Sequence, residues 1–145
     1  MEVPQDYEHR VVVTAFLRRR GQLLLVRRSQ RVGTYQGLWS AVSGYVEHPP
    51  YEQALNEINE ETRLNSEQVR LIAAGDPLEI LDASLRIRWT IHPFLFEVSE
   101  SADIQLDWEN TEFRWVTVTE LDSYPTVPAL KEALDRCLDT PPNGR

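Results

Sequence analysis

The sequence has 145 residues, a common size for one domain with a core of its own. Hydrophobic residues make up 41% and charged residues 26%, which is typical of soluble globular proteins. The net charge of −8 argues against a nucleic-acid backbone or an anionic membrane as the main partner. It does not exclude a phosphate-bearing small molecule, because bound cations can reverse the local field.

The chain has one cysteine, Cys137, which excludes an intramolecular disulfide and favours a reducing compartment. No apolar stretch follows a basic start, and no run approaches the ~20 apolar residues of a membrane-spanning helix. We therefore expect a cytoplasmic protein. With no repeat and no linker in the sequence, we expect a single domain over residues 1–145, with loose tails at 1–8 and 140–145.

The first part of the chain predicts strands with short connections. Val11–Arg18 is rich in β-branched and aromatic residues, and Gly21 marks a turn before the run Gln22–Arg28. These two runs predict a hairpin. A polar loop, Ser29–Gly37, then leads into Leu38–Val46.

A helix is predicted for Ala54–Leu64, after the prolines Pro49 and Pro50, since proline is tolerated near a helix start. On a helical wheel its apolar residues form one stripe, as in a core-facing helix. That stripe consists of Tyr51, Ala54, Leu55 and Ile58. The solvated arc consists of Glu52, Asn56, Asn59 and Arg63.

The second part of the chain predicts further strands and one more helix. The extended runs are Val69–Ala74, Leu78–Leu81, Leu85–Val98 and Phe113–Val118. Val127–Leu138 is an amphipathic helix with Pro128 in its first turn. Helices on the faces of a mixed sheet are the expected architecture, which places the chain in the α/β class.

Three glutamates of the first helix, Glu57, Glu60 and Glu61, are spaced i, i+3 and i+4 and so share one side of it. Like charges at this spacing repel by roughly 0.2–0.5 kcal/mol per pair. A hard divalent cation such as Mg²⁺ or Mn²⁺ would remove that penalty. A solvated acidic face is the alternative, but Glu57 and Glu61 lie beside the apolar stripe. The pattern therefore predicts a metal-dependent enzyme acting on a phosphate-bearing substrate.

The segment Gly44–Leu64 resembles the signature box of the Nudix hydrolases. That box has the pattern G-x5-E-x7-R-E-U-x-E-E-x-G-U, in which U is a bulky aliphatic residue. The matching residues are Gly44, Glu57, Ile58, Glu60, Glu61 and Leu64. Val11–Glu47 and Trp108–Leu138 also look like the family, so the resemblance covers most of the chain. It implies a Nudix-type α/β/α sandwich with a mixed β-sheet.

The box departs from the family pattern in three places. The interval from Gly44 to Glu57 is two residues shorter, so the first Glu of the pattern has no counterpart. Asn56 stands where the pattern has Arg, and Arg63 stands where it has the final Gly. The missing residues mainly orient the metal-binding glutamates and shape the loop, whereas the catalytic glutamates themselves are present.

The resemblance implies a hydrolase that cleaves the pyrophosphate bond of a nucleoside diphosphate linked to another group X. It implies that Mg²⁺ or Mn²⁺ is held by Glu57, Glu60 and Glu61 together with the main-chain carbonyl of Ser43. At Gly44 the main chain could then come close to the metal and the substrate.

Two further residues are candidates for substrate binding. Arg27 and Arg28 point to opposite faces of their strand, so at most one enters a shared cleft. The resemblance favours Arg28 as a contact to substrate phosphate, for which a planar guanidinium is suited. Tyr35, in the polar loop, is the candidate for stacking on a base. A surface arginine and a core aromatic residue are the ordinary alternatives.

Nudix enzymes often supply another carboxylate from the loop before the last strand, as a metal ligand or a general base. Glu109 matches that placement better than Glu112. The general base is left open between Glu60 and Glu109.

Two other functions remain open. The first is a catalytically weak or inactive Nudix-like module that binds a nucleotide as a sensor, which the departures from the box favour. The second is an interaction domain whose acidic helix contacts a basic partner. The substrate is also open among ADP-ribose, a dinucleoside polyphosphate, a nucleoside triphosphate and a nucleotide sugar. The oligomeric state is not fixed, with a homodimer as one option.

Overall fold

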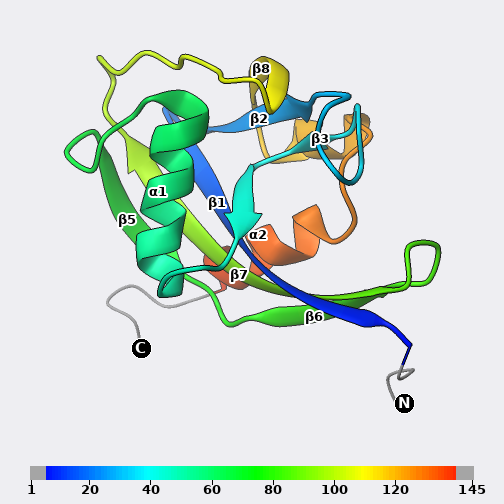
Figure 1. Cartoon of the computed structure of the whole chain (residues 1–145). Helices are drawn as coiled ribbons and strands as arrows, with labels where there is room; N and C mark the ends of the chain where they lie inside the picture. Colours follow the sequence, from blue (N-terminus) through cyan, green and yellow to red (C-terminus); the bar gives the residue numbers. More distant parts are fainter. Residues whose placement is uncertain (1–5, 140–145) are drawn as a thin grey trace.

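The computed structural model describes residues 6–139 and contains a mixed sheet between two α-helices (Figure 1). The strands β1 (Glu8–Arg19) and β7 (Ile87–Val98) pair in parallel, and the other strand pairs are antiparallel. The fold is therefore α/β with a mixed sheet, as predicted. The remaining strands are β2 (Gln22–Arg28), β3 (Trp39–Ser40), β4 (Val42–Tyr45), β5 (Val69–Ala74), β6 (Leu78–Asp82) and β8 (Asn110–Val116).

The two long parallel strands each serve two antiparallel partners. One part of β1 pairs with β4 and its end pairs with β2, which in turn pairs with β3 and β8. The first half of β7 pairs with β6 and the second half with β5. This arrangement brings β4 and the start of β8 to the region covered by the first helix, where the candidate site lies.

The helices α1 (Pro50–Thr62) and α2 (Leu130–Leu138) cover opposite faces of the sheet (Figure 1). Successive strand residues face opposite sides, so Ala15 packs in the α1 core and Phe16 in the α2 core. Each helix contributes its apolar stripe to one core. Among residues 6–139, neither helix has the length and apolar character required to span a bilayer.

Helix α1 is shifted toward the N-terminus relative to the prediction. It begins at Pro50, where the fixed backbone of proline suits the first helical position. It ends at Thr62, because Arg63 takes a left-handed conformation with φ of 67° and donates its N–H to the Asn59 carbonyl. Tyr51, predicted in the buried stripe, is 44% exposed, and Gln53 is buried instead.

Helix α2 begins at Leu130 and not at Val127 as predicted. The Val127 N–H donates to the Trp39 carbonyl over 2.9 Å, which keeps the preceding segment extended beside β3. Ala129 then adopts a left-handed φ of 65° directly before the helix. The prediction failed here because a tertiary contact with β3 overrides the local helical pattern.

Several strand bounds also differ from the prediction, and the predicted run Leu38–Val46 forms two short strands, β3 and β4. β1 starts at Glu8, whose N–H donates to the Arg86 carbonyl, so the predicted tail at 1–8 is too long. β7 starts at Ile87 after a turn in which the Asp82 carboxylate accepts the Ser84 N–H. β8 starts earlier than predicted, at Asn110. Residues 1–5 and 140–145 of the predicted tails lie outside the described residues.

Candidate active site

Three carboxylates from two distant parts of the chain meet beside α1. One oxygen of Glu57, one of Glu61 and one of Glu109 all lie within 4.8 Å of one another. The first two come from α1, and Glu109 comes from the loop directly before β8. That loop is fixed to the end of β2, because the Ser29 N–H donates to the Glu109 carbonyl over 2.8 Å. We call these three residues the acidic cluster.

Glu60, the third glutamate of the predicted set, lies outside the acidic cluster. Its side chain is exposed, whereas Glu57 and Glu61 are buried. It lines a groove on the outer side of Glu109, together with Asp107 and Trp108. Two carboxylates of the helix, Glu57 and Glu61, therefore point inward, and the third, Glu60, lies at the solvent-exposed rim of the site.

The Glu57 carboxylate is confined from two sides. The Gln53 side chain, one helical turn earlier, donates from Nε2 to Glu57 Oε2 over 2.7 Å. On the other side lies Gly44 of β4, where a Cβ atom would fall 2.1 Å from Glu57 Cδ. A side chain at position 44 would therefore displace the Glu57 carboxyl group, and the role of glycine here is to leave space and not to permit an unusual backbone conformation.

The Glu61 carboxylate is held through both of its oxygens. The buried Asn110 side chain donates from Nδ2 to Oε1 over 3.0 Å. The Ser43 main-chain N–H donates to Oε2 over 3.3 Å. Ser43, predicted as a ligand through its carbonyl, thus contacts the acidic cluster through its N–H.

Burial and like charge disfavour the ionised cluster. Burial, with the nearby Glu60 and Glu47 charges adding to it, raises the pKa of Glu57 to about 7. Burial and Asp107 raise the pKa of Glu109 to about 7. Burial also raises the pKa of Glu61 well above its usual value, and the Asn110 hydrogen bond opposes this shift. An all-oxygen, carboxylate-rich set suits a hard divalent cation, which would offset the repulsion.

A cavity of about 280 Å³ lies beside the acidic cluster and is lined by one of its members, Glu109. Predicted residues from four separate segments line it: Arg28, Tyr35, Ser43, Gly44 and Glu109. The structure therefore brings together every predicted substrate residue and all of the predicted cluster except the rim residue Glu60.

Arg28 is one of two arginines that line the cavity, the other being Arg31. The Nε of Arg28 donates to the Thr34 carbonyl over 2.9 Å, which fixes the guanidinium at the cavity wall. Burial lowers its pKa, and the charges of Glu61 and Glu109 oppose that shift. Arg27 is exposed and pairs with Glu112 over 3.2 Å, so the two arginines point in different directions as predicted.

Aromatic rings form another wall of the cavity, from Tyr35, Tyr45 and Trp89. The Trp89 Nε1–H donates to the Tyr35 hydroxyl over 3.0 Å, and that hydroxyl donates to Asp82. The rings of Tyr45 and Trp89 stack with centroids 6.3 Å apart. The Tyr35 hydroxyl group is thus already hydrogen-bonded within the protein, and the Tyr35 ring contributes to the cavity wall.

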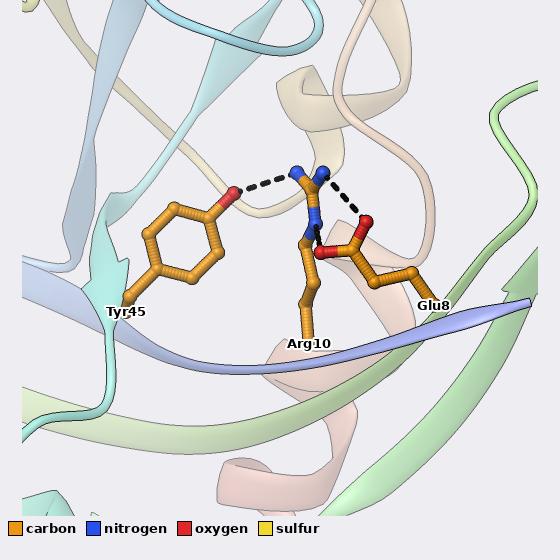
Figure 2. Close-up of polar contacts among 3 residues, drawn as sticks. All are labelled: Glu8, Arg10 and Tyr45. Atoms are coloured by element: carbon orange, nitrogen blue, oxygen red, sulfur yellow. Dashed lines mark hydrogen bonds and ion pairs between the residues drawn. The ribbon is translucent and has the colours of Figure 1, made fainter.

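Tyr45 is held in place by an arginine from β1. Arg10 Nη1 donates to the Tyr45 hydroxyl over 3.0 Å, and the other side of the same guanidinium binds Glu8 through two hydrogen bonds (Figure 2). The Arg10 guanidinium also lies 5.8 Å from the Trp89 ring centroid. These contacts fix the aromatic wall from outside the cavity.

Sequence reasoning missed several residues of the site. Gln53 and Asn110 orient the two buried glutamates, and Tyr45 and Trp89 complete the aromatic wall. Gln53 lies four residues before Glu57 on the same side of the helix, so its spacing was a usable signal. Glu112, the weaker of the two loop candidates, is part of β8 and pairs with Arg27 away from the acidic cluster.

The chain matches the NUDIX domain over residues 8–137 and belongs to the Nudix family. Comparison with curated proteins gave no match. Among solved structures, an Ap4A hydrolase of C. elegans in a binary complex has a TM-score of 0.73 at 16% identity, with 88% of this chain and 93% of that chain covered. The dihydroneopterin triphosphate pyrophosphohydrolase of E. coli has a TM-score of 0.73 at 18% identity, with 90% and 96% covered.

A third similar structure is the NUDIX domain of Shewanella oneidensis NrtR complexed with ADP ribose. It has a TM-score of 0.70 at 15% identity, and the comparison covers 88% of this chain and 85% of that chain. At these identities the three structures show a shared fold. The resemblance drawn from the box is confirmed by the family match, although the box itself departs from the pattern.

Proposed function

We propose that the protein is a metal-dependent hydrolase that cleaves the pyrophosphate bond of a nucleoside diphosphate linked to a group X. The observation that carries this proposal is the cluster of Glu57, Glu61 and Glu109, of which Glu109 lines the same cavity as Arg28. Carboxylates that repel one another at a partly buried site lower the stability of the fold unless a bound ligand offsets the repulsion. Membership of the Nudix family supports the same reaction class.

The donor set fits Mg²⁺ or Mn²⁺. The acidic cluster would hold the cation, with Glu60 and the Ser43 carbonyl as further candidate ligands on the family pattern. When bound, the cation would neutralise phosphate charge and lower the pKa of a coordinated water.

The protein's own side chains would bind and orient the substrate. Arg28 would contact phosphate oxygens, since its planar fork matches them. The rings of Tyr35, Tyr45 and Trp89 would accept the nucleobase by stacking. The pyrophosphate would then lie beside the acidic cluster, and X would lie toward the open side of the site.

Proton transfer would fall to a carboxylate at the outer side of the acidic cluster. Glu109 or Glu60 would accept the proton of the attacking water. The phosphorus–oxygen bond to the bridging oxygen then breaks, which yields a nucleoside monophosphate and a phosphorylated X. No covalent intermediate with the enzyme is required.

The second candidate function is nucleotide binding without turnover. It is favoured by the exposed Asn56, which stands at the box arginine and cannot supply its charge. The NrtR domain, whose structure contains ADP ribose, has the same fold. A sensor of this kind would use the same cavity.

Turnover of a substrate panel tests the proposal. ADP-ribose, a dinucleoside polyphosphate, a nucleoside triphosphate and a nucleotide sugar are each incubated with Mg²⁺ or Mn²⁺, and phosphate is measured after a coupled phosphatase. We expect turnover of at least one compound. The turnover rate should fall by about 100-fold or more in Glu61→Gln and should be unchanged in Glu52→Gln. Glu52 is the matched control because it is exposed on the same helix.

The other outcomes separate the rivals. Calorimetric binding of a panel compound without any turnover would favour the sensor. Neither turnover, nucleotide binding nor a cation-dependent thermal shift would favour the interaction domain, since a bound cation stabilises the native state by mass action.

A further inference from the structure

We propose that Gln53 orients Glu57 for cation binding, a role that Asn56, which stands at the arginine of the family pattern, does not perform. This role rests on the proposed function, because it requires Glu57 to be a cation ligand. Neither the family pattern nor the fold comparison assigns a role to Gln53.

The Gln53 amide has a defined orientation. The side chain is 3% exposed, and its Oε1 accepts the main-chain N–H of Glu47 over 2.9 Å and that of His48 over 3.1 Å. With the oxygen fixed by two donors, the amide nitrogen must face the other way. It donates to Glu57 Oε2 over 2.7 Å. A flipped amide would set donors against donors and leave Glu57 without one.

Asn56 cannot perform this role. It precedes Glu57 by one residue, so a helix turns its side chain about 100° away from that of Glu57. Its side chain is exposed, whereas Gln53 and Glu57 are both buried. The arginine position of the family pattern therefore faces solvent in this protein.

The shortened connection before α1 provides the partners of the Gln53 oxygen. This chain is two residues shorter than the pattern between Gly44 and Glu57. Its compact turn places the N–H groups of Glu47 and His48 within reach of Gln53. One neutral amide thus links the turn to the cluster.

Gln53 and Gly44 act on Glu57 from two sides. The glycine leaves room for the carboxyl group, since a Cβ there would overlap it. The glutamine then holds one oxygen by a hydrogen bond. The other oxygen is left for a ligand, as expected when an outer partner aligns a metal-binding carboxylate.

A purely structural role is the competing explanation. Gln53 would then only fasten the turn to α1, and its loss would lower thermal stability without changing cation affinity. The two roles are separable because Gln53 uses its oxygen for the turn and its nitrogen for Glu57.

Mn²⁺ binding to the full chain, followed by electron paramagnetic resonance and calorimetry, tests the role of Gln53. Gln53→Met removes both groups, whereas Gln53→Glu keeps the oxygen for the turn and removes the amide N–H. We expect both variants to bind Mn²⁺ about 10-fold or more weakly, which is the usual effect of losing an outer partner. Glu52→Gln, the adjacent exposed position, should bind as the parent does.

The Mn²⁺ affinities and thermal stabilities of these variants distinguish the two roles of Gln53. If folded Gln53→Glu keeps the parental Mn²⁺ dissociation constant or binds more tightly, Gln53 only fastens the turn, and the proposed role is wrong. The same conclusion follows if Gln53→Met loses thermal stability but not affinity. If the parent itself binds no Mn²⁺, the metal-dependent function fails first, and the role of Gln53 fails with it.

Discussion

The inner and outer sides of the acidic cluster are built in different ways. On the inner side, Glu57 and Glu61 are buried and are held by donors from α1, β4 and β8. On the outer side, Glu60 is exposed, and Glu109 belongs to a loop that also carries the 53% exposed Trp108. Rigid elements place the inner carboxylates, whereas the outer ones are more open to solvent and can exchange protons with it.

This difference between the two sides predicts that substitutions on them will have different effects. Changes on the inner side should remove cation binding itself, and should alter stability because the groups are buried. Changes on the outer side should lower turnover while leaving the fold intact. The predictions below separate the two sides, from the largest expected effect to the smallest.

The largest effect is expected from Glu57→Gln. A neutral amide binds a hard cation poorly, so turnover should fall by about 100-fold or more, and the thermal shift on adding Mg²⁺ should disappear. In EDTA at pH 8 the variant should melt higher than the parent. The pKa of Glu57 is raised to about 7, so its ionised form costs stability above that pH, and the amide removes this cost.

Thermal melting of parent and variant in EDTA and in Mg²⁺ checks this reversal. Glu52→Gln should show neither effect, because its side chain is exposed. A Glu57→Gln protein that keeps the parental Mg²⁺ shift would remove Glu57 from the cation site.

The next effect is expected from Gly44→Ala. The added methyl group would overlap the Glu57 carboxyl group, with the Cβ 2.1 Å from Cδ, so the carboxylate must move. We expect a loss of at least about 10-fold in Mn²⁺ affinity, comparable with the loss of a partner that aligns a ligand. Turnover should fall with it.

Gly33→Ala is the matched control, since a Cβ at Gly33 meets no atom within 4 Å. Calorimetric titration of Mn²⁺ into both variants makes the comparison. Equal affinity in the two would mean that the position of Glu57 does not matter for binding.

A smaller effect is expected from Glu109→Gln on the outer side. Turnover should fall by roughly 10- to 100-fold, within the range of general-base contributions. In EDTA at pH 8 the melting temperature should not fall, because the pKa of Glu109 is raised to about 7 and the amide removes an ionised group that costs stability there. Glu112→Gln should be nearly silent, since Glu112 pairs with Arg27 in the sheet. If only Glu112→Gln lowers turnover, the outer carboxylate has been wrongly assigned, and if neither does, Glu60 becomes the leading candidate base.

The sequence predicted the inner and outer sides unequally. The spacing of Glu57, Glu60 and Glu61 located the helix and its acidic side, and strand alternation separated Arg28 from Arg27. The sequence could not show that Glu60 would face outward, because the direction of its side chain depends on how α1 packs on β4. The aromatic wall was also beyond reach, since Trp89 reaches the cavity only through the pairing of β7 with β1.

Gln53 illustrates why departures from a family pattern are hard to interpret from sequence. Two departures from the box, Asn56 at the arginine position and the shorter turn before the helix, each supported the interpretation that the protein is inactive. In three dimensions, one buried side chain contacts both the shortened turn and Glu57. Such compensation depends on the backbone path of the turn, which residue spacing does not specify.

The smallest effect on activity is expected from Arg63→Gly, at the groove on the outer side. Arg63 closes α1 with φ of 67°, a conformation that costs a residue with a side chain about 1–2 kcal/mol and that glycine adopts freely. Part of this gain is lost because glycine is more flexible in the unfolded chain. We expect the unfolding free energy to rise by up to about 1 kcal/mol, with the Mn²⁺ affinity unchanged. Urea unfolding followed by circular dichroism measures the change, and Arg63→Ala, which keeps the strain, should give no gain. A marked loss of turnover in Arg63→Gly would show that this guanidinium takes part in binding, and that the outer side is more than an open rim.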